Sequence, residues 1–271
     1  MIQEIRIKNY LSFRDEVVLS FEATKDTTFE ESQVVNVTPK VRLLRFALIY
    51  GANASGKSNL LKAMDFLRDF WFDKKSDIDE DTGVVPFLLD TETPNEPSEF
   101  NIKFFVDDKR YWYTLVLNDK QVIKENLYVY NSVQPSLVFS RELDGTASLI
   151  KLNASLVKAN ATIVEQLNVK CLSNMSFFAA RNQVNCSLAY IDEVRDWMKN
   201  NMMPIIEPGT RMFEYAGKQM EKNAELKAYI LDFVHKADYN ITDVYTEREK
   251  VPIPDFVKTS IMEDKDIPEK T

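Results

Sequence analysis

The octapeptide GANASGKS, residues 51–58, stands between two segments of different character. The run LLRFALIY at 43–50 is almost continuously apolar, which is the pattern of a strand buried on both faces. From Ser58 onward, apolar residues recur at steps of three and four, which predicts an amphipathic helix over 58–71. These residues are Leu60, Leu61, Met64, Leu67 and Trp71. A glycine-rich loop between a buried strand and a helix predicts a P-loop nucleotide-binding fold.

The loop has the spacing G-x-x-x-x-G-K-S, with Gly51, Gly56, Lys57 and Ser58 at the fixed positions. Glycines let backbone N–H groups surround a phosphate without Cβ clashes, and the following helix directs the positive end of its dipole at the same phosphate. The lysine reaches the β- and γ-phosphates, and the serine hydroxyl joins the shell of Mg²⁺. The pattern therefore predicts a triphosphate site with Mg²⁺, against the alternative of a chance glycine turn.

The segments around this loop alternate with a period of two. Residues 2–13 indicate a strand with a small register irregularity, and 17–23 indicate a second strand antiparallel to it. Residues 99–152 predict an antiparallel meander that ends in a hairpin around LDGT. Between the predicted helix and the meander, 73–98 is acidic and proline-containing, which is typical of a surface loop.

From about residue 153 the pattern becomes helical. Three helical segments are expected, followed by a short strand, ITDVYTE, and an end rich in proline and charge. The predicted fold class is mixed α/β, a P-loop NTPase lobe with a mixed or antiparallel sheet and a helical subdomain. The expected divisions are a nucleotide-binding lobe over 1–152, helices over 153–240, and the start of a further, truncated strand region over 241–271.

Composition and charge exclude several classes of protein. The 271 residues carry a net charge of −8, whereas a chain that coats nucleic acid is usually basic. A local basic patch that binds DNA is left open, against scattered solvated cations as the alternative. The residues concerned are Lys8, Arg14, Lys40, Arg42 and Arg45. The charged, alternating N-terminus is no signal peptide, and no apolar run has the roughly 18 residues that span a bilayer. A cytoplasmic protein is expected.

Few residues outside the loop suggest other chemistry. Cys171 and Cys186 have no metal-ligand spacing and are expected to be buried thiols, and His235, the only histidine, falls in a helical pattern. LAYIDE, residues 188–193, imitates a second magnesium-binding strand, but the apolar spacing favours a helix that carries Asp192 and Glu193.

The first 70 residues resemble the opening of ABC-type ATPases of the SMC/RecF/OLD class. The resemblance is closest to AAA-family ATP-binding proteins of bacterial abortive-infection and phage-defence systems. It rests on MIQEIRIKNYLSFRDEVVLSFEATKD and LLRFALIYGANASGKSNLLKAMDFLR, and continues through 95–135 and FFAARNQVN. It implies ATP with Mg²⁺ bound by the phosphate loop, and Gln183 as a Q-loop glutamine near the magnesium and the attacking water. The loop residues are Gly51, Ala52, Asn53, Ala54, Ser55, Gly56, Lys57, Ser58 and Asn59.

The chain also departs from this family. Many relatives carry an arginine where NYLSF has Leu11, so no arginine contact with the nucleotide is expected there. No signature loop, Walker B strand or switch residue follows Asp243. SRELDGTAS at 140–148 imitates the signature but lies before Gln183 and fits a hairpin better. The expectation is half of an ATPase head, either a truncated chain or a natural half.

The resemblance implies a homodimer held together by ATP, controlling an effector protein or nuclease. In this hypothesis each active site is completed by the opposite subunit. A module that binds nucleotide and regulates a partner without hydrolysis is the main alternative. A small-molecule kinase fits less well, because the insert after the helix is acidic and a β-meander follows it. No membrane partner is expected.

Overall fold

The computed structural model describes residues 1–207, 209–237, 239–245 and 247. Contacts divide the chain into two compact units, Met1–Ile205 and Ile206–Thr271. The first unit extends past residue 152, where the sequence pattern placed a boundary. The helices between residues 153 and 205 pack on the sheet of this unit and share its core.

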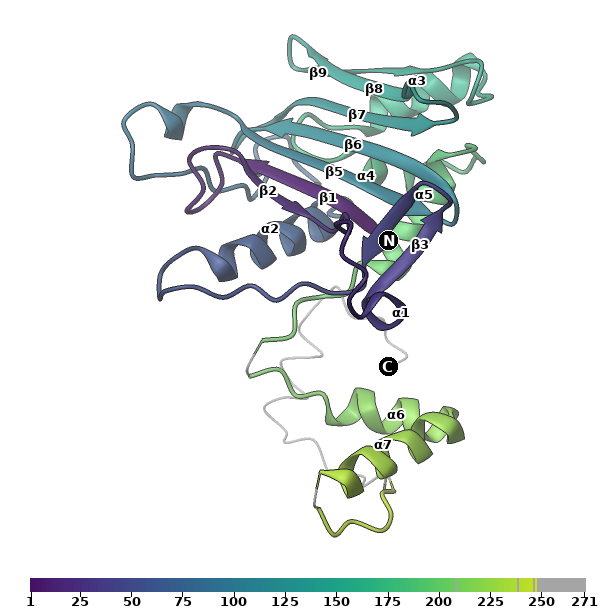
Figure 1. Cartoon of the computed structure of the whole chain (residues 1–271). Coiled ribbons are helices and arrows are strands. Elements are labelled where there is room, and N and C mark those ends of the chain that lie inside the picture. The colour runs from purple at the N-terminus through teal and green to yellow at the C-terminus, as the bar shows by residue number, and fades with distance from the viewer. Residues whose placement is uncertain (208, 238, 246, 248–271) are drawn as a thin grey trace, which may run out of the picture. The chain divides into compact units, whose positions relative to one another are not determined.

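The first unit is built around a seven-stranded antiparallel sheet with strand order β2-β1-β5-β6-β7-β8-β9 (Figure 1). The expected meander and hairpin are confirmed, and the predicted irregularity in the first strand is a register shift between Ile2 and Glu4. The strands are β1 Ile2–Lys8, β2 Val17–Ser20, β5 Ser98–Val106, β6 Lys109–Leu117, β7 Val122–Tyr130, β8 Ser136–Asp144 and β9 Ala147–Leu152.

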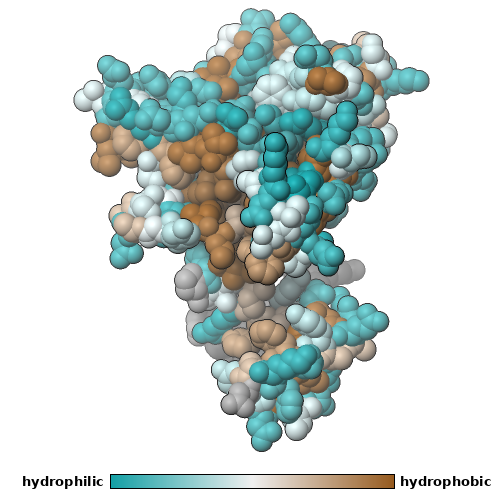
Figure 2. Space-filling model, in the orientation of Figure 1, coloured by the Kyte–Doolittle hydropathy of each residue, from teal (hydrophilic) through white to brown (hydrophobic). Residues whose placement is uncertain are grey.

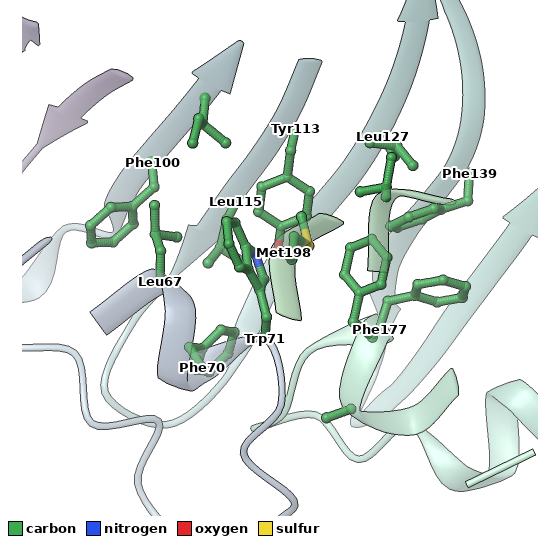
Figure 3. Close-up of a cluster of buried hydrophobic side chains, with 14 of the residues drawn as sticks. Leu67, Phe70, Trp71, Phe100, Tyr113, Leu115, Leu127, Phe139, Phe177 and Met198 are labelled. Carbon is green, nitrogen blue, oxygen red and sulfur yellow. The ribbon is translucent and has the colours of Figure 1, made fainter. Parts of the chain in front are cut away.

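Alternation along these strands gives the sheet one strongly apolar face. Helices α2 (Lys57–Phe70), α4 (Phe177–Arg181) and α5 (Ile191–Asn201) pack against that face (Figure 3). Aromatic pairs join the two layers. They are Trp71 with Tyr113 at 5.6 Å, Phe104 with Trp197 at 4.4 Å, and Phe139 with Phe177 at 4.0 Å between ring centroids.

A buried ion pair lies within this core. Glu125 of β7 and Arg141 of β8 are fully buried, and Arg141 Nη1 lies 3.1 Å from Glu125 Oε2. The same carboxylate accepts hydrogen bonds from the Phe177 N–H at 2.8 Å and the Tyr113 hydroxyl at 2.9 Å. Burial raises the pKa of Glu125, against the opposing effect of Arg141.

The guanidinium of Arg141 also holds the segment that leads into α4. It donates to the carbonyl oxygens of Leu172, Ser173 and Met175, and to the Ser148 hydroxyl at 3.1 Å. Both charged groups of this pair are therefore fully engaged, as a charge pair in a dry core requires. The network fixes the chain before α4, and Gln183 lies two residues after the end of that helix.

Helix α3 (Ala161–Lys170) begins later than the sequence pattern suggested. The Asn160 side chain accepts a hydrogen bond from the Ile163 N–H at 2.9 Å, which caps the helix at this point. The preceding segment is not helical, since Asn153 accepts from the Ser155 N–H in a turn. The expectation of a helix across 153–160 is therefore wrong.

The prediction for residues 43–50 is also wrong in its main point. β4 (Val41–Leu44) pairs with β3 (Val34–Thr38) in a separate two-stranded sheet that follows the short helix α1 (Glu30–Gln33), and a single bridge joins Leu43 to Glu22. Within the described residues, 46–50 form no strand and no backbone hydrogen bond. Leu48 is 81% exposed and Tyr50 91% exposed. Figure 2 shows that hydrophobic residues also gather elsewhere on the visible surface. A run of apolar residues is buried only where neighbouring strands flank it, and none of the described strands does so.

In the described part of the second unit there are two helices, α6 (Phe213–Lys222) and α7 (Ala224–Lys236). α7 confirms a predicted helix, and the Asn223 side chain caps it by accepting from the Leu226 N–H. The expected strand ITDVYTE is absent over 241–245, which have no strand conformation. Residue 246 lies outside the described residues, as does the expected proline- and charge-rich end over 248–271.

Candidate nucleotide-binding loop

Residues 51–56 form a largely exposed loop that leads directly into α2. Ala54 has φ 61° and Gly56 has φ 88°, so the chain turns through the left-handed region twice before the helix begins. Among the described residues, the backbone N–H groups of Gly56, Lys57 and Ser58 have no acceptor. Three unpaired N–H groups at a helix N-terminus form a positively polarised surface that suits a phosphate.

Lys57 lies folded over this loop. Its ammonium group donates to the carbonyl oxygens of Gly51 at 2.9 Å and Ala52 at 2.7 Å. Both contacts are to neutral groups, so the charge of Lys57 has no anionic partner within the described structure. An anion bound at the helix N-terminus would supply that partner.

Ser58 lies one position further on α2 and is exposed, next to the unpaired N–H groups. Its hydroxyl has no hydrogen-bond partner within the described residues and is free to coordinate a cation that accompanies a phosphate. The described part of the chain holds no cluster of three or more acidic, histidine or cysteine side chains that could bind a metal alone. A magnesium ion at this loop would therefore bind together with the nucleotide.

A turn at the N-terminus of the chain packs against the loop, a contact that sequence reasoning missed. The Ser12 hydroxyl accepts a hydrogen bond from the Asn59 amide at 2.9 Å. A Cβ atom at Gly56 would lie 2.8 Å from Ser12 Oγ and 3.2 Å from Phe13. Gly56 is thus required both by its positive φ and by the close approach of this turn. The stretch NYLSF was the one signal, but the sequence separation of 47 residues between Ser12 and Asn59 hid the contact.

Asn9, at the base of this turn, connects it to the acidic segment over 73–98. Its buried amide donates to the carbonyl oxygens of Thr93 and Glu96, and its oxygen accepts from the Phe87 N–H. The backbone N–H of Leu11 donates to the carbonyl oxygen of Val85. Part of the predicted surface loop is therefore attached to the same turn that contacts Gly56.

Gln183 lies elsewhere in the first unit. It lines a cavity of about 660 Å³ together with residues of α3, among them Thr162, Gln166 and Val169. Its amide donates weakly to the Ala179 carbonyl at 3.4 Å. None of the residues lining this cavity belongs to 51–59, and no hydrogen bond joins Gln183 to the loop among the described residues.

The two segments that imitate ATPase motifs, 188–193 and 140–148, have structural roles. Asp192 lies in α5, as predicted, and its carboxylate pairs with Arg181 at 2.8 Å and accepts from the Leu188 N–H. Glu193 pairs with Lys109 at 2.9 Å. The segment 140–148 forms the β8–β9 hairpin, with Gly145 in the left-handed region at φ 62°.

The cations suggested as a local basic patch are partly neutralised. Lys8 pairs with Glu99 at 3.3 Å, Arg14 with Asp90 at 3.0 Å, and Arg42 with Glu30 at 2.7 Å. These pairs favour scattered surface cations over a surface that attracts nucleic acid.

Comparison with known protein families matches part of the first unit. A family model described as "AAA domain, putative AbiEii toxin, Type IV TA system" matches residues 46–151, a range that contains the loop, α2 and most of the sheet. No curated protein matches the chain. None of the described helices has the length and apolar character needed to cross a bilayer. Residues 46–151 are therefore similar to an AAA domain, and the mixed α/β architecture is consistent with a P-loop NTPase-like fold.

Proposed function

We propose that this chain binds MgATP at residues 51–59. The observation that carries the proposal is the set of three unpaired N–H groups at the start of α2, beside a lysine whose charge has no anionic partner among the described residues. In this arrangement the N–H groups and Lys57 hold the β- and γ-phosphates, and Ser58 coordinates Mg²⁺. The match to an AAA domain over 46–151 supports ATP as the nucleotide.

We further propose that the bound ATP joins two copies of the chain, as in ATPases of the SMC/OLD-like class, and that association controls a toxic or DNA-acting effector. The toxin–antitoxin description of the matching family supports this context. The exposed loop leaves the outer side of a bound nucleotide open to a second subunit. Light scattering with and without MgATP tests this part, and an unchanged mass contradicts it.

Lys57→Ala is expected to weaken MgATP binding by about 1.5–3 kcal/mol, because a charged donor to the phosphates is lost. Isothermal titration calorimetry on the purified chain measures the change. Lys62→Ala is the matched control, since Lys62 is an exposed lysine on the same helix, and its variant is expected to bind as the parent does. Equal affinity of the Lys57 variant and the parent would exclude this site.

Ser58→Ala is expected to reduce the dependence of ATP affinity on Mg²⁺, because the variant lacks the hydroxyl proposed as a ligand. The measurement is a pair of titrations with ATP, one in Mg²⁺ and one in EDTA. In the parent the two affinities should differ clearly, and in the variant they should converge. A variant whose affinity responds to Mg²⁺ as steeply as that of the parent rules out Ser58 as a ligand.

A nucleotide-binding regulator that does not hydrolyse ATP is the second candidate. The observation that favours it is the engagement of Asp192 and Glu193 in ion pairs on α5, and the position of Gln183 in a separate cavity. In the described structure, these side chains therefore make their contacts away from residues 51–59. ATP turnover by the purified chain that disappears in Lys57→Ala would exclude this candidate.

A further inference from the structure

The turn over residues 9–13 is held rigidly against α2. Tyr10 and Phe13 exchange backbone hydrogen bonds at 2.9 and 2.8 Å, and Leu11 between them has φ 50°. The Tyr10 ring packs on Phe66 of α2 and Phe100 of β5, at 5.7 and 5.2 Å between centroids. A leucine in the left-handed region is unfavourable by roughly 1–2 kcal/mol, so the surrounding contacts impose this turn.

The effect of the turn is to place Ser12 beside the first turn of α2. Its Oγ lies 2.8 Å from the position of a Cβ at Gly56 and 2.9 Å from Asn59 Nδ2. Ser12 is exposed, and Asn59 is half-buried. The hydroxyl is thus in contact with the residue that precedes the helix and bonded to the residue three positions later.

The hydrogen bond from Asn59 defines how the hydroxyl can act. Asn59 Nδ2 donates, so Ser12 Oγ accepts, and no acceptor for the Ser12 hydroxyl hydrogen is found among the described residues. An exposed hydroxyl with a free hydrogen therefore lies beside Gly56, the first of the three residues whose N–H groups are unpaired. All of these groups are donors at the positive end of one helix, which is the environment that a phosphate oxygen prefers.

We infer that Ser12 is a further phosphate-binding residue, which donates its hydroxyl hydrogen to the nucleotide held at 51–59 while Asn59 fixes its orientation. The inference rests on the proposed function, since it requires a nucleotide at the loop. It also gives the N-terminal turn a functional role, because the turn places the Ser12 hydroxyl beside Gly56.

The test compares MgATP affinities by calorimetry in the parent, Ser12→Ala and Ser12→Thr. Ser12→Ala is expected to weaken binding about tenfold or more, the usual effect of losing one hydrogen bond to a charged group. Ser12→Thr keeps the hydroxyl at an exposed position and is expected to bind within about threefold of the parent. Ser132→Ala is the control, because Ser132 carries an exposed hydroxyl, bonded to the Gln134 carbonyl, in a surface turn between β7 and β8.

Failure of this inference can be distinguished from failure of the proposed function. If the parent binds MgATP in a Lys57-dependent way and Ser12→Ala binds equally well or more tightly, Ser12 is not a ligand and the proposed function stands. If the parent binds no MgATP, both proposals are overturned. Thermal unfolding of each variant, followed by tryptophan fluorescence, shows whether Ser12→Ala retains the fold, and weaker binding counts as support only with an unchanged midpoint. If the midpoint falls, the result of Ser12→Thr decides, because that variant must then restore binding for the inference to stand.

Discussion

Replacing Arg141 with methionine should lower the free energy of unfolding of the first unit by about 3–5 kcal/mol at neutral pH. The substitution leaves the fully buried Glu125 without its charged partner, and removes the donors to three carbonyl oxygens before α4. All three tryptophans of the chain lie in this unit, so their fluorescence during urea denaturation reports its unfolding.

The exposed pair Lys124–Glu142 provides the matched control. It joins the same two strands one register position away, at 3.4 Å, with both side chains about half exposed. Lys124→Met should change stability by less than about 1 kcal/mol, because exposed ion pairs contribute little. Similar losses in the two variants would contradict the assignment of Arg141 as a buried structural charge.

The effect of Arg141→Met should depend on pH in a definite direction. Burial already raises the pKa of Glu125 above its ordinary value of 4.5, and the Coulomb effect of Arg141 opposes that rise. Without Arg141 the pKa rises further, so the folded state binds a proton that the unfolded state releases. The loss of stability in Arg141→Met should therefore be smallest below about pH 4.5. It should grow as the pH rises above the folded-state pKa of Glu125 in the parent, and level off above the higher folded-state pKa of Glu125 in the variant. Glu125→Gln in the same background should recover part of the stability at neutral pH, since the amide oxygen can still accept from Phe177.

Gly56→Ala should abolish measurable MgATP binding and lower the unfolding free energy by about 1–3 kcal/mol. The backbone at this position has φ 88°, which a side chain disfavours, and the new Cβ would lie 2.8 Å from Ser12 Oγ. Either response, a shift of the turn or a shift of the loop, displaces the N–H groups that hold the phosphate. Calorimetry and urea denaturation measure the two effects.

Gly83→Ala separates the backbone effect from the contact. Gly83 has a similar φ of 82°, but no atom lies within 4 Å of the position that its Cβ would occupy. Its variant should lose stability through the backbone alone and should bind MgATP as the parent does. If Gly56→Ala retained the affinity of the parent, the loop would not be the nucleotide site.

Local pattern predicted the elements whose burial depends on their immediate neighbours in the chain. The alternation over 99–152 was sufficient for the meander, because each strand pairs with the next. The three- and four-residue spacing after Ser58 predicted α2, because the hydrogen bonds of a helix are made within the segment itself. The run over 46–50 failed because burial of a two-faced strand depends on flanking strands, which the described residues do not provide.

The candidate site shows the same division. The spacing of Gly51, Gly56 and Lys57 could be read from eight consecutive residues, because the loop and the helix N-terminus are local structures. The contact of Ser12 with Asn59 depends on β1 crossing the sheet beside β5, a tertiary arrangement with no local sequence pattern. The buried network around Arg141 was likewise invisible, since its partners come from β7, β9 and the segment before α4.

The exposed run over 46–50 has a consequence for the handling of the protein in solution. Five uncharged, proline-free residues, most of them aromatic or branched apolar, with unpaired backbone groups, are a typical aggregation-prone window. Purified chains are therefore expected to associate slowly through this window as concentration rises, whether or not nucleotide is present. Self-association of this kind lacks a defined stoichiometry, whereas a dimer formed through ATP has one. A concentration series of light-scattering masses in the Lys57→Ala variant measures this non-specific association alone. It is the baseline against which masses of the parent with MgATP are compared.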